Sequence, residues 1–156
     1  MKNILKLILC IALCQAVGII GAIFTFDAIP TWYITLNKPF FSPPNWVFGP
    51  VWTILYTLMG ISFFLIIKKG WNSKKILSAR NFFLTQLLLN FIWTPIFFGL
   101  KLPLLALFVI LGMDILTVAT IKKTYAISKW AAYLLVPYLA WISFATLLNA
   151  AITVLN

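Results

Sequence analysis

The sequence predicts an all-α membrane protein: one domain, residues 1–156, in which five transmembrane helices form a bundle. The first observation is composition, because 63% of the residues are hydrophobic and only 9% are charged, which is typical of a polytopic membrane protein. The second is length, because the apolar residues fall into five long runs, and a helix needs about 20 such residues to span a bilayer. These runs are too long and too leucine-rich for barrel strands.

We expect helices over residues 4–26, 46–67, 81–100, 102–121 and 130–155. The first run resembles a signal peptide, but it is too long for one and lacks a small-x-small cleavage site. Gly18 and Ala22 within it form a small-xxx-small step, which predicts either close helix packing or one wall of a pocket. Cys10 and Cys14 share one helical face, so we interpret them as packing residues and not as a disulfide.

The chain has a net charge of +10, and the positions of its basic residues indicate the membrane topology. Ten of the cations precede the first helix or lie in the connections before residues 81 and 130. Only Lys38 and Lys101 lie in the other connections. The positive-inside rule then places the N-terminus inside, and the C-terminus and the 27–45 loop outside, of what we expect to be a bacterial cell membrane. We interpret the basic residues in this way, with no nucleic-acid partner and without invoking lipid-headgroup recognition.

The 27–45 loop combines stiffness with apolar rings. It contains four prolines, which exclude a regular helix throughout, together with Trp32, Tyr33, Phe40 and Phe41. Such a loop is predicted to fold back over the bundle as a lid. The alternative is an aromatic belt at the membrane interface, where Trp and Tyr are favoured.

Three helices carry aromatic and polar stripes at steps of three and four residues, which place each stripe on one helical face. On the 46–67 helix, the glycines would permit close approach and the rings would offer flat apolar area, so this face is predicted to wall a pocket for a flat molecule. On the other two helices, the polar residues should face inward, either to bond neighbouring helices or to contact a ligand. The stripes are Gly49, Trp52, Tyr56 and Gly60; Gln86, Asn90, Trp93 and Phe97; and Tyr138, Trp141, Ala145 and Asn149.

Asp114 is the only acid inside an expected span. An intramembrane acid predicts either a functional site or a bond to a neighbouring helix. Because no Lys or Arg lies at that depth, we expect a protonated acid or a partner such as Thr or Tyr. Pro95 is expected to kink the outer end of the 81–100 helix.

Three blocks of the sequence resemble the translocator protein family, known in bacteria as TspO or tryptophan-rich sensory protein and also as the peripheral-type benzodiazepine receptor. The blocks are residues 32–62, which include Trp46-Val-Phe-Gly-Pro-Val-Trp-Thr53; residues 86–99, which include Asn90-x-x-Trp93; and residues 137–149, which include Pro137-Tyr-Leu-x-Trp141. They occur in the family's order, and the resemblance as a whole extends over nearly the whole chain.

The resemblance implies a five-helix bundle whose first loop covers a pocket for porphyrins and other flat hydrophobic ligands. From the residues themselves, and not from the resemblance, we expect Lys38 and Pro43 at the rim of this pocket, and Gln86, Asp114 and Asn149 in polar contacts between helices. The lining implied at matching positions is Trp32, Tyr33, Trp52, Tyr56, Asn90, Trp93, Trp141, Ala145 and Leu148.

Two positions depart from the family pattern. Many bacterial relatives carry an acid at the place of Val109, whereas here the acid is Asp114, five residues later and on another face. Animal members carry a C-terminal cholesterol motif with a basic residue, but here no Lys or Arg follows Lys129, so cholesterol recognition through that motif is not expected.

We therefore expect a membrane protein that binds porphyrins or other tetrapyrroles, in tetrapyrrole handling or sensing. The alternatives are light-dependent porphyrin degradation assisted by tryptophans, and transport of porphyrin or lipid. No catalytic set, metal site or obligatory cofactor is expected, since the chain has no histidine and no paired carboxylates. The partners expected are the ligand and membrane lipid, and a homodimer stays open.

Overall fold

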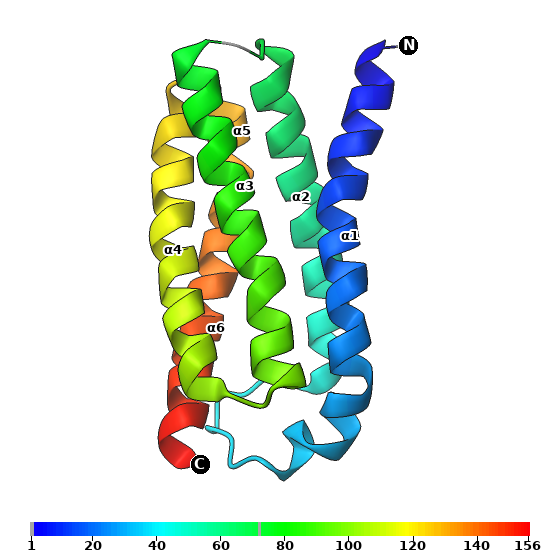
Figure 1. Cartoon of the computed structure of the whole chain (residues 1–156), viewed down its shortest axis with the longest axis vertical. Helices are drawn as coiled ribbons and strands as arrows, with labels where there is room; N and C mark the ends of the chain where they lie inside the picture. The colour runs from blue at the N-terminus through cyan, green and yellow to red at the C-terminus, as the bar shows by residue number, and fades with distance from the viewer. Residues whose placement is uncertain (1, 72) are drawn as a thin grey trace.

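Five long helices run side by side along the longest axis of the molecule (Figure 1). The computed structural model describes residues 2–71 and 73–156; residues 1 and 72, which belong to the expected domain and its 68–80 loop, lie outside the described part. The long helices are α1 (Lys2–Thr31), α2 (Phe48–Lys68), α3 (Lys74–Thr94), α4 (Pro103–Tyr125) and α6 (Val136–Leu155). Short turns are η1 (Tyr33–Thr35), η2 (Asn45–Val47), η3 (Pro95–Gly99) and α5 (Lys129–Tyr133).

The five spans confirm the predicted fold class. Five segments are long and apolar enough to cross a membrane, and the residues described are otherwise helical or irregular, without strands. Their packing leaves much apolar surface facing outward, where it can contact the hydrocarbon of a bilayer. Ile23, for example, is 69% exposed. The protein is thus an integral, multi-pass membrane protein.

The helix ends differ from those expected, beginning with α1 and α3. α1 continues five residues past residue 26 and includes Pro30, which has no N–H to donate. The N–H of Trp32 nevertheless donates to the carbonyl of Ala28 at 2.9 Å, so the helical ladder resumes after the proline. α3 begins at Lys74, seven residues early, where the Ser73 hydroxyl accepts from the N–H of Ile76 at 3.3 Å and caps the helix. Basic side chains in its first turns can extend their charged ends to the interface.

Prolines explain the breaks near residues 95 and 135. The expected 130–155 helix is divided into α5 and α6, since Pro137 has no N–H to continue the helical ladder. Pro95 opens η3, a π-type turn in which the N–H of Leu100 donates to the carbonyl of Pro95 at 2.8 Å. The outer end of α3 is therefore distorted where a kink was expected. α4 ends at Tyr125, four residues beyond the expected end.

The two ends of the bundle differ in charge. The N-terminus, the α2–α3 connection and the α4–α5 connection lie at one end, and the C-terminus lies at the other with the loop before α2 (Figure 1). The ten cations assigned to one side belong to the first end, here called the basic end, and Lys38 and Lys101 to the opposite end.

Close packing of α1 on α2 depends on two glycines. A Cβ at Gly60 would lie 2.5 Å from the Cα of Ile11, and a Cβ at Gly18 would lie 2.5 Å from a ring carbon of Tyr56.

Cys14 is fully buried in the hydrophobic core that these helices help to form. Cys10 and Cys14 are both free thiols.

Candidate functional site: an aromatic cavity beneath the first loop

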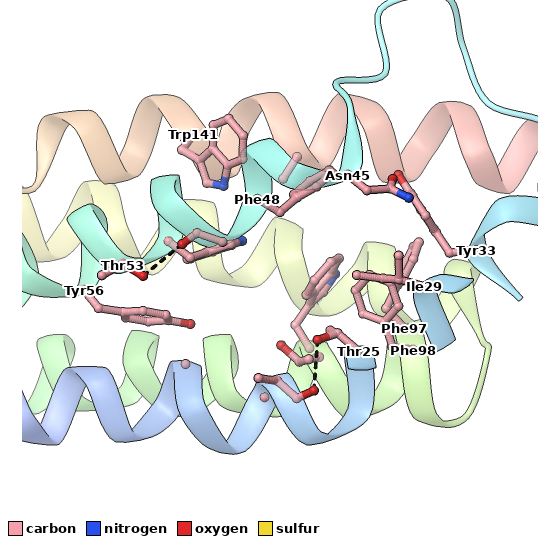
Figure 2. A pocket seen from close by; sticks show the side chains of 18 of the residues that line it. Thr25, Ile29, Tyr33, Asn45, Phe48, Thr53, Tyr56, Phe97, Phe98 and Trp141 are labelled. Atoms are coloured by element: carbon pink, nitrogen blue, oxygen red, sulfur yellow. Dashed lines mark hydrogen bonds between the residues drawn. The ribbon is translucent and has the colours of Figure 1, made fainter. Parts of the chain in front are cut away.

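A cavity of about 390 Å³ lies in the half of the bundle away from the basic end. Ligand pockets commonly measure roughly 300 to 1,000 Å³. Figure 2 shows Tyr56 deep in this cavity, Trp141 on the α6 wall, and Tyr33, Phe97 and Phe98 at its outer end. Residues of α1, α2, α3, η3 and α6 form the walls, and their spacing of three and four residues turns each set inward.

The α2 wall is made of stacked rings. The indole of Trp52 stacks on the phenol of Tyr56 with ring centroids 5.3 Å apart and planes 26° apart. Trp52 also meets Tyr138 of α6 edge-to-face at 6.4 Å. These contacts fix Trp52 as a rigid, flat surface on the cavity.

The α3 wall presents a second stacked pair. Trp93 stacks on Phe97 at 5.0 Å with an interplanar angle of 22°. The indole N–H of Trp93 donates to Oδ1 of Asn149 on α6 at 3.1 Å. Stacking and the hydrogen bond together fix the orientation of the Trp93 ring.

The α6 wall consists of Trp141, Ala145 and Leu148, with Asn149 beside them. Trp141 packs edge-to-face on Phe48 at 6.0 Å. Its indole nitrogen is buried and has no hydrogen-bond partner among the described residues. A buried donor without a partner is costly, so an acceptor supplied by a bound molecule would be favoured at this position.

The start of the loop after α1 covers the outer end at Tyr33, as the lid prediction has it, whereas Phe40 is 100% exposed and does not point into the bundle. Tyr33 is only 3% exposed and packs on Phe97 and Phe98, with centroids 6.4 and 5.7 Å away. The ammonium of Lys38 lies 4.5 Å from the centroid of the Tyr33 ring. Burial raises the pKa of the Tyr33 phenol above its ordinary value, and a hydrogen bond with Ser42 partly offsets that shift.

α1 supplies a wall that the sequence left undecided between packing and pocket. Gly18 serves both roles, since it packs on Tyr56 and lines the cavity. At the deep end, the Gln15 amide donates to the carbonyl of Thr53 and to the hydroxyl of Thr57, both at 2.9 Å. The signal available in the sequence was the small-residue spacing of Gly18 and Ala22. The α1 lining is Gln15, Gly18, Ile19, Gly21, Ala22, Thr25 and Ile29.

Comparison with known proteins agrees with this architecture. The sequence profile of the TspO/MBR family matches residues 10–155. The chain belongs to the TspO/MBR family. It is 48% identical over 155 residues to the tryptophan-rich protein TspO of Archaeoglobus fulgidus, covering 99% of both chains. It is 44% identical to the protein of that name from Chlorobaculum tepidum, covering 99% of this chain and 98% of the relative. It is 40% identical over 131 residues to the translocator protein of Homo sapiens, covering 83% of this chain and 78% of that protein.

In this TspO/MBR family member, seven of the nine implied lining residues do line the cavity: Tyr33, Trp52, Tyr56, Trp93, Trp141, Ala145 and Leu148. The other two, Trp32 and Asn90, lie outside its wall. Trp32 packs edge-to-face on Phe97 at 5.7 Å and supports the wall. Asn90 is buried between two phenols, accepting from Tyr56 at 2.6 Å and donating to Tyr138 at 3.1 Å. Helical spacing predicts which face a residue occupies but not whether the cavity reaches that depth.

The remaining predicted residues take structural positions. Lys38 and Pro43 lie outside the lining, with Lys38 on the outer side of Tyr33. Asn149 does line the cavity and bonds the carbonyl of Pro103 on α4 at 2.8 Å. Gln86 is fully buried, and neither end of its amide has a partner among the described residues.

Asp114 connects α4 to α6 and does not line the cavity. Its carboxyl group accepts from the hydroxyl of Thr146 at 2.7 Å and of Ser143 at 3.3 Å. A threonine partner was one of the expected arrangements. The acid therefore forms a polar link between α4 and α6 in this chain.

Proposed function

We propose that the protein binds porphyrins, other tetrapyrroles and similar flat hydrophobic molecules in the membrane, in tetrapyrrole handling or sensing. The observation that carries the proposal is the cavity walled by the rings of Trp52, Trp93 and Trp141, the last with a buried indole N–H that has no partner among the described residues. A flat aromatic ligand gains stacking area from the rings, and a carbonyl or carboxylate on that ligand would satisfy the buried donor.

The outer end of the cavity suits the acidic edge of such a ligand. Lys38 belongs to the loop itself, with its ammonium 4.5 Å from the centroid of the Tyr33 ring, and ammonium groups bond carboxylates through charge-assisted hydrogen bonds. The chain contains no histidine, the commonest haem ligand, so a metal-free porphyrin is the ligand class proposed. The orientation proposed places the basic end inside the cell and the loop before α2 outside.

Quenching of tryptophan fluorescence by a metal-free dicarboxylic porphyrin tests this proposal on purified protein in nanodiscs. Trp141→Phe keeps a ring and removes the donor, so affinity should fall about tenfold, equivalent to roughly 1.4 kcal/mol. Trp52→Ala removes stacking area and should also weaken binding. The control is Trp130→Phe, because Trp130 is 75% exposed and lies outside the cavity. Equal affinities for all four proteins would overturn the proposed site.

Light-dependent degradation is the second candidate, favoured by the indoles that line the cavity at Trp52, Trp93 and Trp141. Illumination of the porphyrin complex in air distinguishes it from binding alone. A bilin-like absorbance that forms with the wild-type chain and not with Trp141→Phe would support enzymatic degradation. Bleaching at equal rates in both would support binding alone.

A transport role is tested separately, because binding does not require movement across the membrane. Porphyrin flux into proteoliposomes would be compared between the wild-type chain and Trp52→Ala. Flux that requires Trp52 would support transport, whereas equal leakage in both preparations and in empty liposomes would exclude it.

A further inference from the structure

The contact between α1 and α2 is closed over one stretch and open over the next. On the closed side, Gly18 packs against the ring of Tyr56, and Gly60 packs against the backbone of Ile11. The Gln15 amide bonds Thr53 and Thr57 of α2 at 2.9 Å. These contacts hold the two helices together from the level of Ile11 and Gly60 to the floor of the cavity.

Beyond this floor, the two helices leave the cavity uncovered. Ile19 and Ala22 of α1 and Gly49 and Thr53 of α2 line the cavity and are also exposed at the outer surface of the bundle. Ile19 is 68% exposed. A Cβ added at Gly49 would meet nothing within 4 Å. We name this opening, bordered by those four residues, the α1–α2 seam.

The seam opens toward lipid. All four residues belong to segments long and apolar enough to span the membrane, and none of them carries a charge. The one polar side-chain group at its edge, the hydroxyl of Thr53, donates to the carbonyl of Gly49 at 2.9 Å. Such an uncharged opening admits hydrocarbon-soluble molecules and offers no charge to an ion. A flat apolar molecule dissolved in the bilayer would therefore meet the cavity directly at the seam.

The loop at the outer end is fastened, in contrast to the seam. The backbone N–H of Asn37 donates to Oδ1 of Asn156 at 2.9 Å, and Nδ2 of Asn156 donates to the carbonyl of Asn37 at 3.0 Å. The side chain of Asn37 donates to the carbonyl of Leu155 at 3.3 Å. Opening the loop would break this clasp to the end of α6 and would also expose the buried ring of Tyr33.

We propose that the ligand enters and leaves through the α1–α2 seam, directly from the bilayer, while the clasped loop stays closed. The inference rests on the proposed function, because it assigns the route by which a flat hydrophobic ligand reaches that cavity. The ring system would pass between Ala22 and Gly49, and an acidic edge would stay at headgroup depth on the side of Lys38.

Filling the seam tests this route. Gly49→Leu and Ala22→Leu place the same side chain at its two sides, and a Cβ at Gly49 would meet nothing within 4 Å. The matched control is Ala16→Leu, since Ala16 is an exposed α1 residue that does not line the cavity. Stopped-flow quenching with a metal-free porphyrin already dissolved in the nanodisc lipid should show association and dissociation slowing together, about tenfold or more, in both seam variants. A lost ligand contact would instead speed dissociation.

A variant that weakens the clasp tests the alternative route, entry through the loop. Asn156→Ala removes two of the three hydrogen bonds that fasten the loop and should leave both rate constants at wild-type values. If Asn156→Ala speeds exchange while Gly49→Leu and Ala22→Leu exchange at the wild-type rate, the loop is the route and the proposal is overturned.

A measurement without porphyrin separates the seam from the proposed function. Lipids with brominated acyl chains quench tryptophans that the chains can reach, and the Trp141 contribution is obtained by difference from Trp141→Phe. Quenching of Trp141 that Gly49→Leu abolishes, and Ala16→Leu does not, supports the seam even if no porphyrin binds. Absence of any Trp141 quenching in the wild-type chain would contradict an opening to lipid.

Discussion

The indole N–H of Trp93 donates to Oδ1 of Asn149 at 3.1 Å, so a single amide orients a cavity wall and joins α3 to α6. The other end of that amide donates to the carbonyl of Pro103 at 2.8 Å, in the first turn of α4. Asn149 is 1% exposed. Three helices therefore meet at one buried side chain beside the cavity.

Asn149→Leu should destabilise the protein by about 1 to 3 kcal/mol, because it leaves the buried Trp93 donor without a partner. The measurement is thermal unfolding in detergent, followed by circular dichroism. Asn149→Asp keeps an acceptor for Trp93 and should therefore lose less stability than Asn149→Leu. Equal losses for the two variants would show that the Trp93 bond is not the stabilising contact.

Gly60→Ala should destabilise the α1–α2 contact by about 1 to 3 kcal/mol through overpacking, since its Cβ would lie 2.5 Å from a backbone atom of Ile11. Gly49→Ala is the matched control, because its Cβ would meet nothing within 4 Å. Unfolding temperatures of the two variants give the comparison. A lower midpoint for Gly49→Ala than for Gly60→Ala would contradict the packing described.

Side-chain chemistry explains why much of the site could be predicted from the sequence. Trp52, Trp93 and Trp141 recur with other aromatic or polar residues at helical spacing, and such stripes are poorly suited to face lipid. Spacing places each stripe on one helical face, and its aromatic and polar chemistry directs that face inward. The fold class follows from five apolar runs and a charge distribution that places the basic residues at one end.

The α1 wall could not be predicted in the same way, because Gly18, Ile19 and Ala22 are residues that lipid and protein interiors both accept. Their role depends on how far α2 diverges from α1, which is a tertiary property. The position of Asn90 illustrates a second limit. The helical face of Asn90 was predicted from the sequence. The depth of the cavity floor was not, because that depth is set by the hydrogen bond between Tyr56 and Asn90.

The buried chain of hydrogen bonds from Tyr56 through Asn90 to Tyr138 should behave as one unit. Tyr56→Phe leaves Oδ1 of Asn90 without its donor, 2.6 Å away in the wild-type chain, and should cost about 1 to 3 kcal/mol. Once Asn90→Leu has removed the amide, Tyr56→Phe should cost much less. A thermodynamic cycle of the four proteins, from unfolding in mixed detergent, measures this coupling. Additive losses would show that the three side chains act independently.

Asp114 should tolerate substitution better than Asn149, although it is an acid within a membrane span. Thr146 bonds the carboxyl group at 2.7 Å but can also donate to the carbonyl of Ile142, 2.9 Å away. Asp114→Asn should therefore change the free energy of unfolding by less than about 1 kcal/mol. Porphyrin affinity should not change, because Asp114 does not line the cavity. Thermal unfolding and tryptophan quenching check the two expectations, and a fall in affinity with unchanged stability would give Asp114 a role in ligand binding.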